Sequence, residues 1–230
     1  MSVAHFDAIA SVYDESLPAH VVGHYLRKRT AYVLRHCPTG AGLDVGCGTG
    51  SLAQRLAEAG YQMTGVDPSR GMLEILRRQA PSVRAVQASG GALPFPDNRF
   101  ELVITVATLH HIADRAQVRA TLEEMVRVLK PGGRLVVWDH NSRNPRWPSL
   151  MARVPQDTGE ERLIGEQEIV TGLRSAGAIA VSCVQLGFVP DFVPPALLKV
   201  ASVTERLAER TPMVRRYGAH NVVLASKPPQ

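Results

Sequence analysis

The sequence predicts an α/β fold with a largely parallel sheet. Short β-type runs alternate with amphipathic helical stretches along most of the 230 residues, and this alternation is typical of β-α units. A glycine-rich turn follows the first β-type run, and an aspartate ends the second. In a parallel sheet these two features lie at the same edge. The length is sufficient for one packed domain.

Five runs are predicted as the parallel strands, at 43–45, 62–66, 83–87, 101–106 and 134–138. Three helices are predicted between them, at 51–59, 69–79 and 116–129. Each has apolar residues at helical spacing; in the first, for example, Leu52, Leu56 and Ala59 share one face. The third is expected to end at Pro131-Gly132-Gly133.

The remaining elements flank this core. Helix-like residues 17–36 have no strand partner nearby, so we interpret them as a cap over the sheet. A helix over 165–176 precedes two runs, 181–186 and 220–225, which are expected to close the sheet as a hairpin-like pair. Between these runs, 189–217 contains four prolines and an apolar-basic helix. Function-specific contacts are expected in such an insertion.

Composition excludes several classes of protein. Charged residues make up 20% and hydrophobic residues 45% of the chain, and the three cysteines are far apart, which excludes disordered and disulfide-stapled classes and favours a reducing compartment. The first ten residues resemble no export signal, and no apolar run is long enough to span a membrane, so we expect a cytoplasmic protein. The net charge of +5 is mild, and the basic clusters are short and not interleaved with aromatic residues. Nucleic-acid binding is therefore not expected.

The glycine-rich turn is the most informative segment. Gly46, Gly48 and Gly50 form G-x-G-x-G, with Ser51 at the sixth position, where the dinucleotide-binding pattern has Gly or Ala. Asp44 precedes the turn, and its carboxylate suits an ammonium group better than a pyrophosphate. Asp67 lies 17 residues beyond Gly50, a distance at which an acid accepts hydrogen bonds from ribose hydroxyls. These features predict a zwitterionic ligand that carries a ribose.

Five ordered motifs extend this pattern, at 43–50, 66–69, 93–100, 109–111 and 129–133. Together they resemble the class I S-adenosylmethionine-dependent methyltransferases, in the group of ubiquinone and menaquinone biosynthesis enzymes (methyltransferase type 11 domain). Residues 6–14 resemble the same group. The resemblance implies a Rossmann-like, seven-stranded, mostly parallel sheet with helices on both faces and an antiparallel last strand. It also implies three parts: an N-terminal helical cap at 1–40, an S-adenosylmethionine-binding core at 41–140, and the rest of the sheet at 141–230, with a substrate-side insertion near 189–217.

The cofactor that the resemblance implies is S-adenosylmethionine, bound across the carboxyl ends of the strands. By that analogy Asp44 meets the methionine ammonium, Asp67 holds the ribose, and Tyr13 closes over the methionine end. The other implied cofactor contacts are Gly46, Cys47, Gly48, Pro68, Met72 (against the adenine), Val106 and His111 (both beside the transferable methyl). Ser89 departs from the family, which has an acid there that binds the adenine amino group. We therefore expect Ala88 and Gly90 to contribute adenine contacts through their backbone.

Methyl transfer needs a general base only when the acceptor loses a proton with difficulty. His111 and His140 are the candidates, with Tyr13 a weaker one. Each histidine can also be purely structural, and Asp139-His140 can simply cap a loop. The spacing of His110, His111, Asp139 and His140 matches no metal-binding pattern, so no metal site is predicted.

These observations predict a small-molecule methyltransferase that acts on an oxygen or carbon of an apolar natural product, quinone or isoprenoid-like acceptor. Two alternatives stay open: methylation of tRNA or protein, and a non-catalytic cofactor-binding module. Three interpretations of 189–217 also stay open. It can be core or lid, a wall for a lipid-like substrate beside Phe188 and Phe192, or a peripheral membrane contact with basic residues on its polar side.

Overall fold

The computed structural model describes residues 3–159 and 161–229. The strands described are β1 (Ala41–Val45), β2 (Gln62–Asp67), β3 (Arg84–Gln87), β4 (Phe100–Val106), β5 (Leu129–His140), β6 (Ile179–Leu186) and β7 (His220–Ser226). The α-helices are α1 (Val3–Ile9), α2 (Ala19–His36), α3 (Ser51–Glu58), α4 (Arg70–Gln79), α5 (Arg115–Val128), α6 (Trp147–Met151), α7 (Glu166–Ser175), α8 (Leu198–Arg210) and α9 (Pro212–Arg215). Short 3-10 turns are η1 (Ala10–Glu15), η2 (Leu109–His111) and η3 (Pro195–Leu197).

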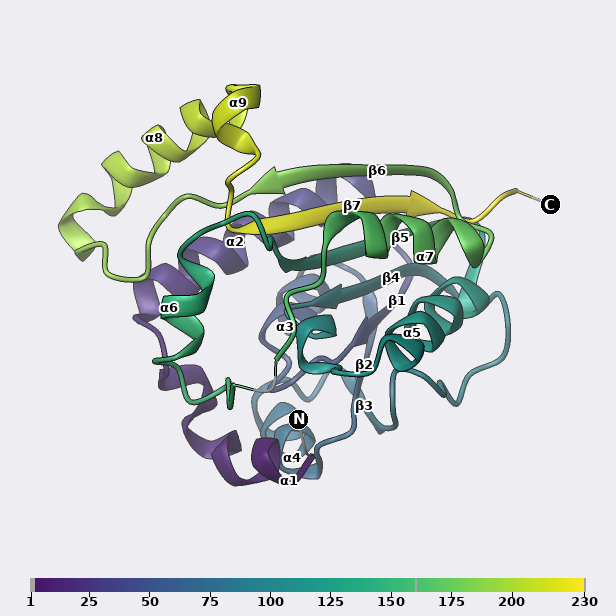
Figure 1. Cartoon of the computed structure of the whole chain (residues 1–230). Coiled ribbons are helices and arrows are strands. Elements are labelled where there is room, and N and C mark those ends of the chain that lie inside the picture. Colours follow the sequence, from purple (N-terminus) through teal and green to yellow (C-terminus); the bar gives the residue numbers. More distant parts are fainter. Residues whose placement is uncertain (1–2, 160, 230) are drawn as a thin grey trace.

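The strands form one sheet in the order β3-β2-β1-β4-β5-β7-β6 (Figure 1). The pairs from β3 through β5 are parallel, whereas β7 runs antiparallel to both β5 and β6. The predicted seven-stranded, mostly parallel sheet with an antiparallel last strand is confirmed. The last two strands do pair with each other, and β7 inserts between β6 and β5.

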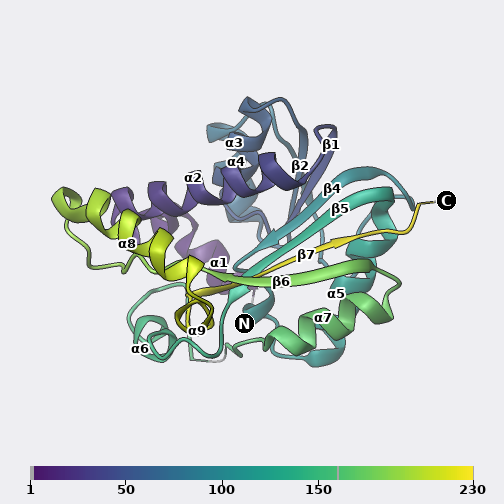
Figure 2. The ribbon, with the colours of Figure 1, turned by 90° about the horizontal axis from the view of Figure 1, so that it is seen from above.

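Helices cover both faces of the sheet (Figure 2). On one face α5 and α7 contribute Leu122, Met125 and Leu173 to a buried cluster with the strands, and on the other α3 and α4 contribute Leu56 and Leu73. Each of these five side chains is at most 1% exposed. Full burial of such a side chain contributes roughly 1.5–3 kcal/mol. The apolar residues that recur at helical spacing in the sequence are therefore the ones that these helices pack against the sheet.

The elements differ from the predicted ones in three places. Residues 3–15 are helical, and α6 follows β5; neither was predicted. Pro131-Gly132-Gly133 was expected to end the third helix, but it lies within β5: helix α5 ends at Val128, and β5 begins at Leu129. The pairing of β4 with β5 shifts in register between Phe100 and Leu102, and this shift accommodates the three residues. The predicted strand 134–138 is the regular part of β5.

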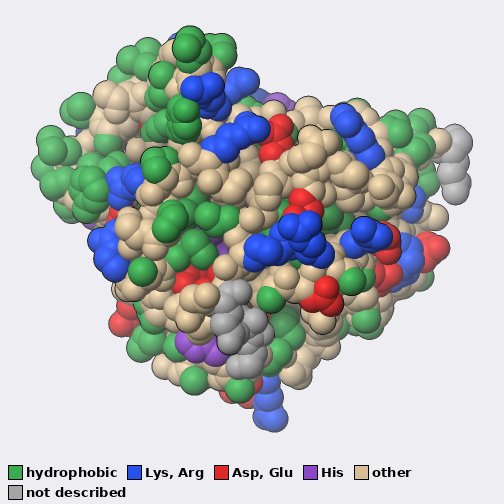
Figure 3. Space-filling model, viewed as in Figure 1, with side chains coloured by type: hydrophobic (Ala, Val, Ile, Leu, Met, Phe, Trp, Pro, Cys, Tyr) green, Lys and Arg blue, Asp and Glu red, His purple; other side chains and the backbone are tan. Residues whose placement is uncertain are grey.

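Helix α8 lies outside the sheet alongside α2 (Figure 2). Leu198 and Ala201 pack toward Val21 of α2, but Val200 and Leu207 are 61% and 58% exposed. Figure 3 shows apolar side chains gathered at this end of the molecule. The interpretation of this segment as buried core therefore does not hold for the outer face of α8.

The order of the strands determines where a ligand can bind. Strand β1 lies between β2 and β4: the chain continues from β1 to β2 and β3 on one side and then returns to add β4 and β5 on the other. Crevices open at the carboxyl ends of strands at such a point. Val45, Asp67, Val106 and His140 end four of the strands there. Within the described residues, every helix is too short or too polar to cross a membrane.

Candidate active site

The glycine turn connects β1 to α3 with a backbone that requires glycine. Gly46, Gly48 and Gly50 have φ values of +73°, +54° and +87°, a region that L side chains rarely adopt. A Cβ on Gly46 would lie 2.2 Å from the Cγ2 of Thr108, whereas one on Gly48 would meet only Tyr13, at 4.0 Å. Gly46 is thus packed against protein, and Gly48 leaves open space beneath Tyr13.

Asp67 joins this turn to the end of β2. Its Oδ2 accepts a hydrogen bond from the Gly48 amide and its Oδ1 accepts one from the Ser69 amide, both at 2.9 Å. Burial raises the pKa of Asp67, and these two hydrogen bonds oppose that shift. Each carboxylate oxygen keeps a further lone pair, so Asp67 can also accept from a hydroxyl in the cavity.

Asp44 is a buried acid beside the cavity. It is 3% exposed, and within residues 3–159 and 161–229 its carboxylate has no ion-pair partner. Burial raises the pKa of Asp44 to about 7; the charge of Asp67 adds to this shift, and Arg29 of α2 opposes it. A buried carboxyl in this state favours a cationic group that reaches it from the cavity.

The N-terminal segment covers the cavity from one side. Asp14 accepts a hydrogen bond from Thr49 at 2.9 Å, and Asp7 accepts from Ser69 at 2.6 Å and from the Gly71 amide at 2.8 Å. These contacts hold α1 and η1 over the glycine turn and α4. Tyr13 thereby lies beside Gly48, 4.0 Å from where a Cβ on that glycine would be.

Four neighbouring rings, each tilted by 35–45° to the next, form another part of the wall. The ring centroids of His111 and His110 are 4.0 Å apart, those of His110 and His140 are 3.9 Å apart, and those of His140 and Trp147 are 3.5 Å apart. Asp139 is 2.7 Å from His110 Nδ1. Burial lowers the pKa of His111 to about 3 and that of His140 well below its ordinary value. Both imidazoles are therefore neutral at neutral pH.

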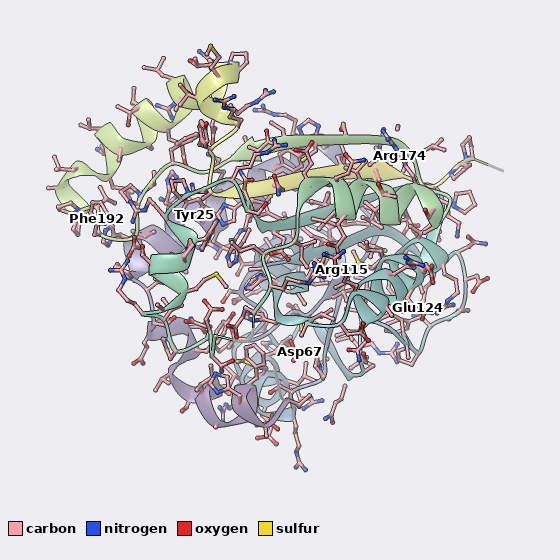
Figure 4. The ribbon with its side chains drawn as sticks, in the orientation of Figure 1. Tyr25, Asp67, Arg115, Glu124, Arg174 and Phe192 are labelled. Carbon is pink, nitrogen blue, oxygen red and sulfur yellow. The ribbon has the colours of Figure 1, made fainter. Side chains whose placement is uncertain are left out.

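These groups line one cavity of about 1010 Å³, at the upper end of the range of roughly 300–1,000 Å³ for small-molecule sites. Tyr25 and Asp67, labelled in Figure 4, come from the helical cap and the parallel core and both line it. The predicted site residues that line it are Tyr13, Asp44, Gly46, Cys47, Gly48, Asp67, Pro68, Met72, Ser89, Gly90, Val106, His111 and His140. Ala88 instead packs against the core, and its amide hydrogen-bonds to the Asp67 carbonyl.

Five lining residues were not predicted. Arg29 and Tyr25 come from α2, and His220 comes from β7. Trp147 comes from α6, and Asp157 comes from the loop after α6. None belongs to a recognisable motif, and the chain brings them together only through its fold. The one available signal was the basic Arg27-Lys28-Arg29 run, of which Arg29 faces the cavity.

Comparison with known proteins agrees with this geometry. Residues 43–137 match the methyltransferase domain family. A demethylmenaquinone methyltransferase of Renibacterium salmoninarum is 35% identical over 136 residues, which cover 58% of this chain and 56% of that protein. The chain therefore spans little more than half the length of this curated relative.

Two solved structures share the fold. One is an S-adenosylmethionine-dependent methyltransferase of Thermotoga maritima, described as a possible histamine N-methyltransferase, with a TM-score of 0.73, 22% identity and coverage of 97% of this chain and 98% of that one. The other is a [4+2]-cyclase, with a TM-score of 0.59, 24% identity and coverage of 88% and 81%. The family predicted from the sequence motifs is confirmed: residues 43–137 of this chain form a domain of the methyltransferase family.

Proposed function

We propose that this chain is an S-adenosylmethionine-dependent methyltransferase that acts on a small, apolar, aromatic acceptor. The observation that carries the proposal is Asp44, a buried carboxyl that has no ion-pair partner in the described parts of the chain and that lines a cavity large enough for two molecules. S-adenosylmethionine supplies an electrophilic methyl group on a sulfonium. The residues of the chain have to bind this cofactor, orient the acceptor and exclude water.

The proposed cofactor half of the cavity uses the residues at the strand ends. Asp44 attracts the methionine ammonium, and Arg29 lies on the same side for the methionine carboxylate. Asp67 accepts hydrogen bonds from the ribose hydroxyls while it stays bonded to the Gly48 and Ser69 amides. Met72 packs along the adenine, near Ser89 and Gly90. Ser89 is already bonded through its Oγ to the Gly91 amide at 3.3 Å, so the adenine contact that an acid makes in the family is weaker here.

The proposed acceptor half is rich in aromatic rings. His220 lies with its ring centroid 5.3 Å from Tyr25 and 5.5 Å from Trp147, and the ring of Trp147 contacts that of His140 at a tilt of 35°. Aromatic walls favour a flat ring system. A quinol or similar phenol matches this lining, and the relative from Renibacterium is named for a menaquinone precursor. His111 and His140 remain the proposed reactive groups beside the methyl and the acceptor.

A lipid-like acceptor also explains the outer face of α8. Val200, Val203 and Leu207 are exposed on α8, as are Phe192 and Leu197 before it and Met213 and Val214 after it. Lys199, Arg206 and Arg210 are exposed on α8 as well. Apolar side chains flanked by basic ones suit an anionic lipid surface. We assign the 189–217 segment to peripheral membrane contact.

We test this contact by sedimentation with lipid vesicles. We expect the parent chain to sediment with anionic vesicles but not with neutral ones, and the double variant Val203→Ser/Leu207→Ser to sediment less. Equal sedimentation of the parent and the variant with anionic vesicles contradicts the assignment.

The main test is a calorimetric titration of the purified chain with S-adenosylmethionine, with NADH as the control ligand for the glycine turn. We expect saturable binding of the first alone, and loss of binding in Asp67→Ala with the thermal unfolding transition retained. Unchanged binding in Asp67→Ala contradicts the proposed site. Incubation with labelled cofactor and a panel of phenols, quinols and isoprenoids then tests methyl transfer.

A second candidate function is the non-catalytic module that the sequence left open; one solved structure with this fold is named as a [4+2]-cyclase and not as a methyltransferase. In that case the domain binds its cofactor without transferring the methyl group. Binding of S-adenosylmethionine with no S-adenosylhomocysteine formed against any acceptor, including tRNA and protein from an extract, favours this alternative.

A further inference from the structure

Three cavity-lining side chains place metal-binding atoms around one point. His110 and His111 belong to η2, and Asp157 lies in the loop after α6. The Oδ1 of Asp157 is 3.9 Å from His110 Nε2 and 3.9 Å from His111 Nδ1. These separations are too long for hydrogen bonds. The Oδ1 of Asp157 is buried and has no hydrogen-bond partner among the residues that the structure describes, which is costly for a buried carboxylate oxygen.

The environment of His110 determines which of its nitrogens faces Asp157. Its Nδ1 lies 2.7 Å from Asp139 Oδ1, and the other oxygen of Asp139 accepts from the Leu109 amide at 2.7 Å. An ionised carboxylate only accepts hydrogen bonds, so His110 donates from Nδ1, and in the neutral imidazole Nε2 then carries the lone pair. A carboxylate that orients a histidine in this way is the usual companion of a metal-binding imidazole.

We propose that His110, His111 and Asp157 bind one divalent transition-metal ion, most naturally Zn²⁺. Two imidazoles and one carboxylate suit zinc, iron or manganese better than magnesium or calcium, which prefer oxygen ligands alone. The three ligand atoms lie within 4.8 Å of one another. Tetrahedral zinc with bonds of about 2.0–2.1 Å separates its ligands by roughly 3.3 Å, so each of the two 3.9 Å separations that involve Asp157 has to shorten by about half an ångström. The spacing in the sequence predicted no metal because Asp157 lies far from both histidines along the chain.

Three protein ligands leave a fourth coordination position open. In this arrangement His111 acts as a ligand of the ion and not as a general base. Tyr13, Val106 and His140 line the same cavity, and this is the side on which the proposed function places the methyl group. Resting on that function, the ion binds the hydroxyl of a phenol or enol acceptor and lowers its pKa. The hydroxyl proton passes to solvent, the oxygen forms the O–CH₃ bond as the CH₃–S⁺ bond breaks, and the bonding pair stays on sulfur.

The test uses the full chain without a histidine tag and Co²⁺ as the spectroscopic probe. We expect one equivalent of Co²⁺ to give visible d–d absorption and Zn²⁺ to displace it. Asp157→Asn and His111→Gln each remove one ligand, and we expect them to weaken binding at least about tenfold. Asp191→Asn, at a cavity carboxylate paired with Arg146, and His36→Gln, at an exposed histidine, are the matched controls and should bind as the parent does.

Two results overturn the proposal: no Co²⁺ binding by the parent chain, or equal binding by the parent and both ligand variants. Because two ligands are changed separately, a folding defect in one variant leaves the other to decide. Calorimetry with S-adenosylmethionine on the same samples separates the two proposals. Cofactor binding without metal binding refutes the metal site alone, and metal binding without cofactor binding refutes the proposed function alone.

Discussion

Asp44 lies at the end of β1 with three charged or titratable neighbours: Asp67 on β2, Cys47 in the turn and Arg29 on α2. Burial and the charge of Asp67 outweigh the guanidinium and raise the pKa of Asp44 to about 7. The free protein therefore holds this carboxyl partly protonated at neutral pH. A ligand ammonium group favours the ionised form, so binding and ionisation are coupled.

The sign of the pH dependence follows from this coupling. Below about pH 7 Asp44 has to lose a proton before it can pair with the ammonium, so cofactor affinity falls by up to about tenfold per pH unit as the pH is lowered. Calorimetry in two buffers of different ionisation enthalpy should detect the released proton. The Asp44→Asn variant should bind weakly and release none. A flat affinity between pH 5 and pH 8 in the parent would falsify the coupling.

Two glycines of the turn give a matched pair of substitutions. In Gly46→Ala both the positive φ and the 2.2 Å approach to Thr108 oppose the new Cβ, so we expect a loss of at least about 2 kcal/mol in the free energy of unfolding. In Gly48→Ala only the positive φ opposes the new Cβ, and we expect a loss of about 1–2 kcal/mol in the free energy of unfolding. The new methyl group enters the space below Tyr13. Denaturant unfolding and calorimetry should show Gly46→Ala as the less stable protein and Gly48→Ala as a folded protein that binds cofactor poorly. Equal unfolding midpoints would contradict this ranking.

At the scale of elements, α8 is fixed to α2 by one buried cluster of charges. Glu205 is 2% exposed and lies 2.8 Å from both His24 Nε2 and Lys28 Nζ. Its other oxygen accepts from the Phe188 amide at 2.8 Å. Burial opposes ionisation, yet the hydrogen bond from His24 and the charge of Lys28 hold the pKa of Glu205 at about 2.

A lowered pKa means that Glu205 stabilises the fold above its unfolded-state pKa of about 4.5, and this stability is lost as the pH falls toward 2. We expect Glu205→Gln to cost about 2–3 kcal/mol at pH 7 and to speed amide exchange in α8. The difference from the parent should shrink between pH 5 and pH 3. Glu209→Gln, at the end of the same cluster, is the control and should cost less. A difference that grows on acidification would refute the assignment.

At the scale of the whole molecule, the cavity is closed by segments from distant parts of the chain. The His5 ring bonds to the Pro155 carbonyl at 2.8 Å, and Gln156 donates to the Tyr13 carbonyl at 3.4 Å. Tyr25 donates to the Val189 carbonyl at 2.7 Å. The N-terminal segment thus contacts the loop after α6, and α2 contacts the loop after β6. We expect bound ligand to order these segments.

We therefore expect S-adenosylmethionine to slow amide exchange in 3–15 and in 152–158, although only the first of these segments carries a family motif. Exchange in β1, already buried, should change little. Hydrogen exchange with mass spectrometry in the presence and absence of cofactor measures both. Protection confined to the glycine turn would show that these segments do not close on the ligand.

The alternation of strands and helices, the glycine turn, and the acids Asp44 and Asp67 could all be predicted from the sequence, because period, chain breaks and turn chemistry are local properties. The family could be predicted as well, since five motifs keep their order along the chain. The tertiary structure alone decided that β7 lies inside the sheet, that the apolar face of α8 points outward, and that Arg29, Trp147 and Asp157 join the site. Those outcomes depend on which distant surfaces pack together, and helical or strand period carries no information about the partner.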